Sequence, residues 1–153
     1  MSERKAYKTT KVPVSRTQEA IRRLLMKYGV MGCQFTDNFE SGEIILRFVK
    51  KVDEMPRTVQ ISLFAEGNEK QAYRQLHYWL KSQLEAVDFG LTRFEQAFLA
   101  HFEWVLETGE VTTIGDIVIP ELSRQTAGRL LGPGITGTRE SETQVEGEWE
   151  EVE

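Results

Sequence analysis

The chain has 153 residues, of which 40% are hydrophobic and 28% are charged, with a formal net charge of -5. This length fits one domain whose core is large enough to fold unaided. No apolar run reaches the roughly 18 to 20 residues that span a bilayer, so we expect no integral membrane protein. The charged N-terminus predicts no secretory signal, and the single Cys33 predicts a reducing, cytoplasmic setting.

Charge is distributed unevenly along the chain. Residues 1–27 hold eight basic and two acidic residues, whereas the last fifteen residues hold seven glutamates and one arginine. Such asymmetry is typical of chains that contact a polyanion or carry an interaction tail, although charged ends are also often only solvated. Residues 1–60 carry twelve basic and seven acidic residues, which makes this segment the candidate anion-binding part of the chain.

The C-terminal segment differs in composition from the rest. Residues 132–153 are rich in glycine and glutamate, so ordering them would bury too little apolar surface to offset the lost chain entropy. We therefore expect a single domain over residues 1–131 and a flexible acidic tail over 132–153. Trp149 and Val152 stand among the glutamates of this tail and are its candidate partner-binding residues, although the tail also fits a purely solubilising role.

The first predicted elements are an extended segment and a helix. Residues 5–14 are rich in threonine and valine and contain Pro13, which favours an edge strand or an extended arm. Ser15 and Gln18 form a capping-box pattern, and apolar residues then recur at helical spacing until Gly29, where a C-terminal cap belongs. Basic residues fall on the opposite side of this helix, so it is amphipathic with a basic outer face.

Three strands and further helices follow. Residues 33–39, 44–48 and 59–63 alternate between apolar and polar side chains, which predicts an antiparallel meander with one apolar face. A long helix is expected over residues 69–87 with Asn68 as its cap, and a third helix after a second capping box at Thr92. A further short helix before Pro120 and a small hairpin over 105–119 are both possible.

This order predicts an α+β fold. A three- to four-stranded antiparallel sheet packs on helices in the order β-α-β-β-β-α-α. The same helix–sheet–helix layout occurs in double-stranded-RNA-binding modules and in the core of some recombination annealing proteins, and the start of the second helix resembles that of the former modules except for its single lysine, Lys70.

The sequence contains no pattern typical of an enzyme, a metal site or a cofactor site. The two histidines, His77 and His101, lie in different helices without ligand-forming partners, and no phosphate-binding loop occurs. Asp37 and Glu43 flank a turn, and the third strand lacks the acid and lysine that restriction-type nucleases place there. We therefore expect a non-enzymatic protein without metal or cofactor.

The positive signal is electrostatic. Basic side chains hold a nucleic-acid backbone through counterion release, without regard to base sequence. If the basic residues of the first sixty positions gather into one surface, the protein binds nucleic acid or a nucleoprotein there. The candidate contacts are Lys8, Lys11, Arg16, Arg23, Lys27, Arg47 and Lys51.

Two segments resemble a known group of proteins. They are similar to segments of small, uncharacterised bacteriophage and prophage proteins. The first is KTTKVPVSRTQEAIRRLLMKYGV, residues 8–30, and the second is LEAVDFGLTRFEQAFLAHF, residues 84–102. The resemblance covers about residues 8–115, departs from the group in the shorter middle part, and includes neither the tail nor an active site. It implies a phage or mobile-element accessory protein in the cytoplasm of a host cell.

An alternative function uses a protein partner instead of nucleic acid. The chain would then be an adaptor or an inhibitor of a host or phage protein, acting through the acidic tail or through exposed aromatic residues of the second helix. Tyr78 and Trp79 both lie off the main apolar stripe of that helix. Neither function requires contact with a membrane.

Overall fold

The computed structural model describes residues 6–125 and confirms the α+β class. The chain divides into two units, residues 1–115 and 116–153, with the division inside the last helix. No helix among the described residues is long and apolar enough to cross a membrane. The elements are α1 (Val14–Lys27), β1 (Gly32–Asn38), β2 (Glu43–Val52), β3 (Met55–Phe64), α2 (Glu69–Asp88), α3 (Phe94–Phe98), the 3-10 turn η1 (Leu99–His101), β4 (Glu103–Val105), β5 (Val111–Thr113) and α4 (Ile114–Arg124).

The first unit is built on an antiparallel sheet in the order β1-β2-β3. Phe35, Leu46 and Ile61 stand opposite one another in its register, as the period-two pattern predicts. Because side chains alternate along a strand, one face of the sheet is apolar and buried beneath the helices, while the other is mostly polar. The buried core from the sheet consists of Ile44, Leu46, Phe48, Val59 and Ile61.

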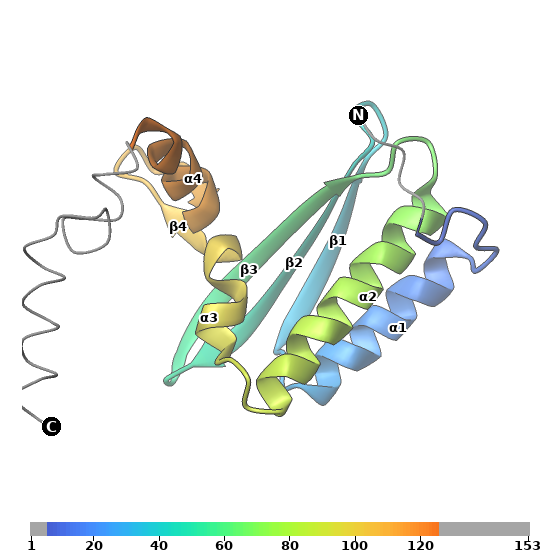
Figure 1. Ribbon diagram of the computed structural model, residues 1–153, viewed down its shortest axis with the longest axis horizontal. Coiled ribbons are helices and arrows are strands. Elements are labelled where there is room, and N and C mark those ends of the chain that lie inside the picture. Colours follow the sequence, from blue (N-terminus) through green and yellow to red (C-terminus); the bar gives the residue numbers. More distant parts are fainter. Residues whose placement is uncertain (1–5, 126–153) are drawn as a thin grey trace, which may run out of the picture. The chain divides into compact units, whose positions relative to one another are not determined.

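Helices α1 and α2 lie side by side on the apolar face of this sheet and run in the same direction (Figure 1). Val14, at the start of α1, lines the same pocket as Glu69 and Lys70, at the start of α2, which agrees with the parallel arrangement. Asn68 caps α2 as predicted, since its side chain accepts a hydrogen bond from the backbone N–H of Gln71 at 3.0 Å.

A buried polar chain links the two helices to the sheet. The Tyr73 hydroxyl of α2 donates to the Asp37 carboxylate of β1 at 2.6 Å and accepts from the Gln18 amide of α1 at 3.1 Å. Burial and the neighbouring carboxylate raise the pKa of Tyr73, so the hydroxyl keeps its proton and remains a donor. Gln18 therefore ties α1 to α2. The capping box predicted for Ser15 and Gln18 is wrong, because α1 begins after Pro13 without a side-chain cap.

Of the two alternatives for residues 5–14, an edge strand or an extended arm, the strand is wrong. Residues 6–9 form turns, residues 10–13 are irregular, and α1 already begins at Val14. Side chains of α2 hold the backbone of this segment: the amides of Gln71 and Gln75 donate to the carbonyl of Ala6, at 2.8 and 3.1 Å. The segment thus pairs with a helix surface where a strand would pair with a sheet edge.

The predicted third helix stops earlier than its apolar spacing indicates. Helix α3 ends at Phe98, and the chain turns through η1 into a β4–β5 hairpin. A hairpin was predicted over residues 105–119, but it begins earlier, at Glu103, and ends at Thr113. Phe94, Phe98 and Phe102 are all buried, but Phe102 enters the core from extended chain, bridging to Val59 of β3. Helix α4 then continues through Pro120 to Arg124.

Candidate nucleic-acid interface

The outward side of α1 is basic, as the sequence predicts. Thr17, Ile21 and Leu25 are buried against the core, so residues half a turn away from them point outward. Two basic residues on this outward side have partners nearby. Arg23 lies 3.3 Å from the Glu19 carboxylate of the same helix, and the Lys27 ammonium lies 5.6 Å from the ring centre of Tyr28. The exposed basic residues of this side are Arg16, Arg23 and Lys27.

Helix α2 carries a second basic stripe, which the sequence analysis missed. Its members recur at spacings of four, three and four residues, so they lie along one side of the helix. Tyr73, on this side, reaches Phe35 of β1 and Gln18 of α1, whereas Trp79, on the other side, packs against Phe98 of α3. The stripe therefore lies on the side of α2 that faces α1. Its members are Lys70, Arg74, His77 and Lys81.

The parallel packing brings these two stripes together. Because α1 and α2 are parallel neighbours on one face of the sheet, the basic outward side of α1 and the stripe of α2 run alongside each other (Figure 1). We name the combined surface the α1–α2 basic face; it is lined by Arg16, Arg23, Lys27, Lys70, Arg74, His77 and Lys81. Two glutamates lie among these cations, Glu19 and Glu85, and each pairs with a neighbouring cation.

The electrostatics of His77 are consistent with a positive surface. Burial lowers the pKa of His77, and the charges of Arg74 and Lys81 lower it further. Arg74, Arg16 and Lys70 make no ion pair with any residue in the described range. The α1–α2 basic face thus holds cations that no acid among residues 6–125 neutralises, which favours the binding of an external anion.

The structure does not bring the whole predicted set together. Arg47 and Lys51 occupy alternate positions of β2 from Leu46 and Phe48, so they lie on the opposite face of the sheet from the helices. Arg47 is moreover held in a two-pronged ion pair by Glu103 of β4, with nitrogen–oxygen distances of 2.5 and 3.0 Å. The expectation of one patch made by these residues is corrected accordingly.

The other predicted contacts fall at the edge of the basic face or outside the described residues. Lys8 and Lys11 lie in the segment before α1, and the Lys8 carbonyl accepts a hydrogen bond from the Asn68 amide at 3.2 Å, which places this segment at the start of α2.

Of the residues predicted to bind a protein partner, Trp149 and Val152 lie outside the described residues. Trp79 is half-buried against Phe98, with ring centres 5.7 Å apart, so it is not one of the exposed aromatic residues.

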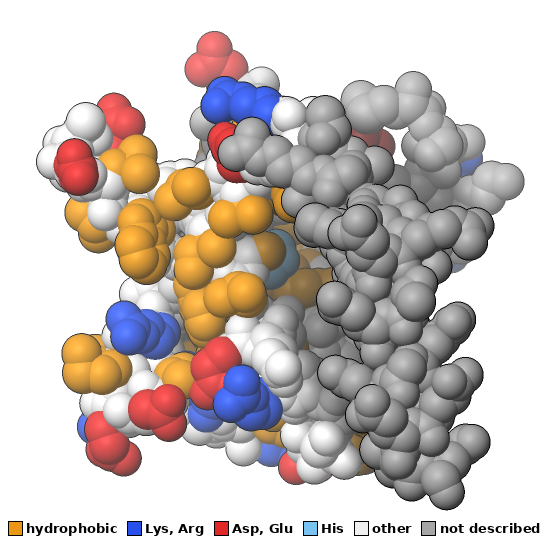
Figure 2. All heavy atoms as spheres, turned by 60° about the vertical axis from the view of Figure 1, so that its left-hand side comes forward, with side chains coloured by type: hydrophobic (Ala, Val, Ile, Leu, Met, Phe, Trp, Pro, Cys, Tyr) orange, Lys and Arg blue, Asp and Glu red, His pale blue; other side chains and the backbone are white. Residues whose placement is uncertain are grey.

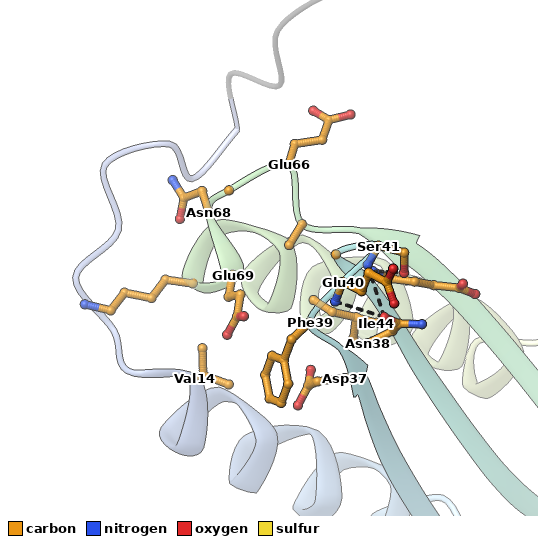
Figure 3. A pocket seen from close by; sticks show the side chains of 15 residues that line it. Val14, Asp37, Asn38, Phe39, Glu40, Ser41, Ile44, Glu66, Asn68 and Glu69 are labelled. Atoms are coloured by element: carbon orange, nitrogen blue, oxygen red, sulfur yellow. Dashed lines mark hydrogen bonds between the residues drawn. The ribbon is translucent and has the colours of Figure 1, made fainter.

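The end of the unit where α1 and α2 begin is acidic. A pocket of about 630 Å³ opens there between the β1–β2 turn and the start of α2, and its walls carry Asp37, Glu40, Glu43, Glu66 and Glu69. Figure 3 shows Asp37, Glu69 and the exposed Phe39 around it. Within the described part of the chain, no three His, Cys, Asp or Glu residues are placed to hold a metal ion. Lys70 of the basic face also lines this pocket, but the acids around it outnumber it and would repel phosphate, so the basic face ends here.

Comparisons with known protein families, with curated proteins and with solved structures found no match to the chain.

The η1 turn and the β4–β5 hairpin expose apolar residues. Leu99, Trp104, Val105 and Val111 expose half or more of their surface; Val105 and Val111 pair across the hairpin on one of its faces, and Trp104 points to the other. Figure 2 views the molecule from the side of the hairpin and shows hydrophobic side chains gathered there. Exposed apolar clusters of this kind commonly mark surfaces for protein partners. The unit therefore presents two kinds of candidate surface, a basic helical one and an apolar one at the hairpin.

Proposed function

We propose that this protein binds nucleic acid through the α1–α2 basic face, without enzymatic activity. The observation that carries the proposal is the parallel packing of α1 and α2, which aligns two basic stripes along one surface. Arg16 and Lys27 of α1 and Arg74 of α2 come from positions far apart in sequence. Binding through such cations releases counterions from the phosphate backbone, and it falls steeply with salt.

The biological setting rests on the resemblance to phage and prophage proteins. It supports an accessory role in the nucleic-acid metabolism of a phage or mobile element inside a host cell. The proposal keeps Arg16, Arg23 and Lys27 from the predicted set and adds the cations of α2. It leaves out Arg47 and Lys51, which lie on the opposite face of the sheet.

The test is a salt-dependent affinity measurement with a matched control. Arg74→Gln removes from the basic face a cation that forms no ion pair within residues 6–125, whereas Lys51→Gln removes an exposed cation from the opposite face of the sheet. We measure binding of a fluorescently labelled oligonucleotide between low and moderate salt. Arg74→Gln should weaken binding and reduce the salt slope by about one unit, and Lys51→Gln should change neither. Undetectable binding at low salt, or equal losses in both variants, would overturn the proposal.

The exposed apolar residues of the hairpin support an adaptor as the second candidate function. Trp104 and Val105 are 55% and 64% exposed and lie in one hairpin with the exposed Val111, which favours contact with a protein partner. The variant Trp104→Ser should lose a partner that the intact protein captures from nuclease-treated host lysate. Retention of every captured protein by this variant would remove the hairpin from consideration.

A further inference from the structure

An aromatic pair stands on the outer surface of α2. Tyr78 is 61% exposed and Tyr7 is 39% exposed, and their ring centres lie 6.2 Å apart with the rings inclined at 53°. Both side chains are too exposed to contribute much to the core. Large flat rings that remain open to solvent are surfaces on which another flat group can stack.

The segment that carries Tyr7 is fixed in place by α2. Its backbone is held on either side of Tyr7, at Ala6 by the amides of Gln71 and Gln75 and at Lys8 by the amide of Asn68. Tyr7 itself has a φ of +60°, in the left-handed region that residues other than glycine rarely adopt. Such strain persists only where surrounding contacts impose it, and it tends to occur at functional positions.

Cations flank the aromatic pair. Arg74 precedes Tyr78 by four residues and Lys81 follows it by three, so all three lie on neighbouring turns of the same side of α2. Both cations belong to the α1–α2 basic face. An exposed ring between backbone-binding cations is the combination by which proteins hold single-stranded nucleic acid, because each base can stack while its phosphates are neutralised.

We infer that the ligand of the α1–α2 basic face is single-stranded nucleic acid, with a base stacked on Tyr78 and the adjoining phosphates held by Arg74 and Lys81. This inference rests on the proposed function and deepens it. In a duplex the bases are stacked on one another and cannot reach the ring, so a duplex would contact only the charges. The strand preference of the protein is therefore set by Tyr78, and the salt dependence by the cations.

The experiment compares one oligonucleotide in two forms. A labelled 20-nucleotide DNA strand of mixed sequence is titrated with the full chain, alone and annealed to its complement, and affinity is read from fluorescence anisotropy. The intact protein should bind the single strand more tightly. Tyr78→Leu, which keeps an apolar side chain but removes the ring, should weaken single-strand binding about tenfold and leave duplex binding unchanged. Tyr78→Phe should bind like the intact protein.

Phe39→Leu is the matched control. Phe39 is 85% exposed but stands at the acidic pocket, so loss of its ring should not alter binding. Tighter binding of the duplex by the intact protein, or equal losses of strand and duplex binding in Tyr78→Leu, would overturn the inference while leaving the proposed function in place. Failure of the intact protein to bind either form would overturn the proposed function itself.

Discussion

Thr17 of α1 is fully buried, and its hydroxyl oxygen has no hydrogen-bond partner among the described residues. A buried polar atom without a partner loses its bonds to water and gains none in return. Thr17→Val replaces this hydroxyl by a methyl group of similar size. We predict that the free energy of unfolding rises by about 1 kcal/mol, as measured by chemical denaturation.

Thr36→Val provides the comparison for this prediction. Thr36 lies exposed on the polar face of β1, so its hydroxyl remains hydrated and the same substitution there should change stability little. A loss of stability in Thr17→Val would show that the hydroxyl is bonded in solution and would contradict the prediction.

His77 should make binding dependent on pH. Its pKa lies below the ordinary value of 6.5 because of burial and of the charges of Arg74 and Lys81. A bound phosphate backbone would offset these cations and raise the pKa of His77, so binding takes up a proton. Affinity for the labelled oligonucleotide should therefore increase as the pH falls from about 8 to about 5.5.

The variant and the free protein supply the checks on His77. His77→Gln should bind with an affinity that hardly changes over the same pH range. If this variant kept the pH dependence of the intact protein, His77 would not be the group that takes up the proton. In the free protein a fall in pH has the opposite effect, because it lowers the stability of the fold. Because folding lowers the pKa, the stability that the neutral form of His77 contributes is lost as the pH falls below about 6.5 through the lowered folded value.

At the scale of elements, the junction between β5 and α4 depends on Gly115. A Cβ at this position would lie 2.8 Å from the carbonyl oxygen of Ala100, closer than real contacts allow. Gly115→Ala should therefore push the junction away from Ala100 and lower stability by about 1–3 kcal/mol, measured as a lower thermal midpoint. Gly32→Ala, whose added Cβ meets nothing within 4 Å, should be nearly neutral; equal effects of the two substitutions would contradict this explanation.

The sequence predicts those elements whose determinants are local. Asn68 caps α2 through the backbone three residues later, and the three long strands follow their own period-two pattern. Elements set by distant partners were predicted incorrectly. Phe102 has helical spacing from Phe98, but its place in an extended segment depends on Val59, and the turns before α1 depend on amides of α2.

The same distinction governs the candidate site at the scale of the whole molecule. The basic stripe of α1 is visible in the sequence because it lies within one helix. The stripe of α2 also has helical spacing, but its place beside α1 follows from the parallel packing of the helices. Arg47 shows the reverse case, because Glu103, which neutralises it, is 56 residues away in sequence. Charge counted along a segment therefore does not locate a surface until the packing is known.

The union of the two stripes into one surface can be tested by combining substitutions from both helices. Lys27→Gln lies on α1 and Arg74→Gln on α2, and neither residue forms an ion pair within the described residues. If one nucleic-acid backbone contacts both helices, each substitution should lower the salt slope of binding by about one unit and the double variant by about two. If the affinity of the double variant were no lower than that of the single variant with the lower affinity, only one helix would contact the ligand.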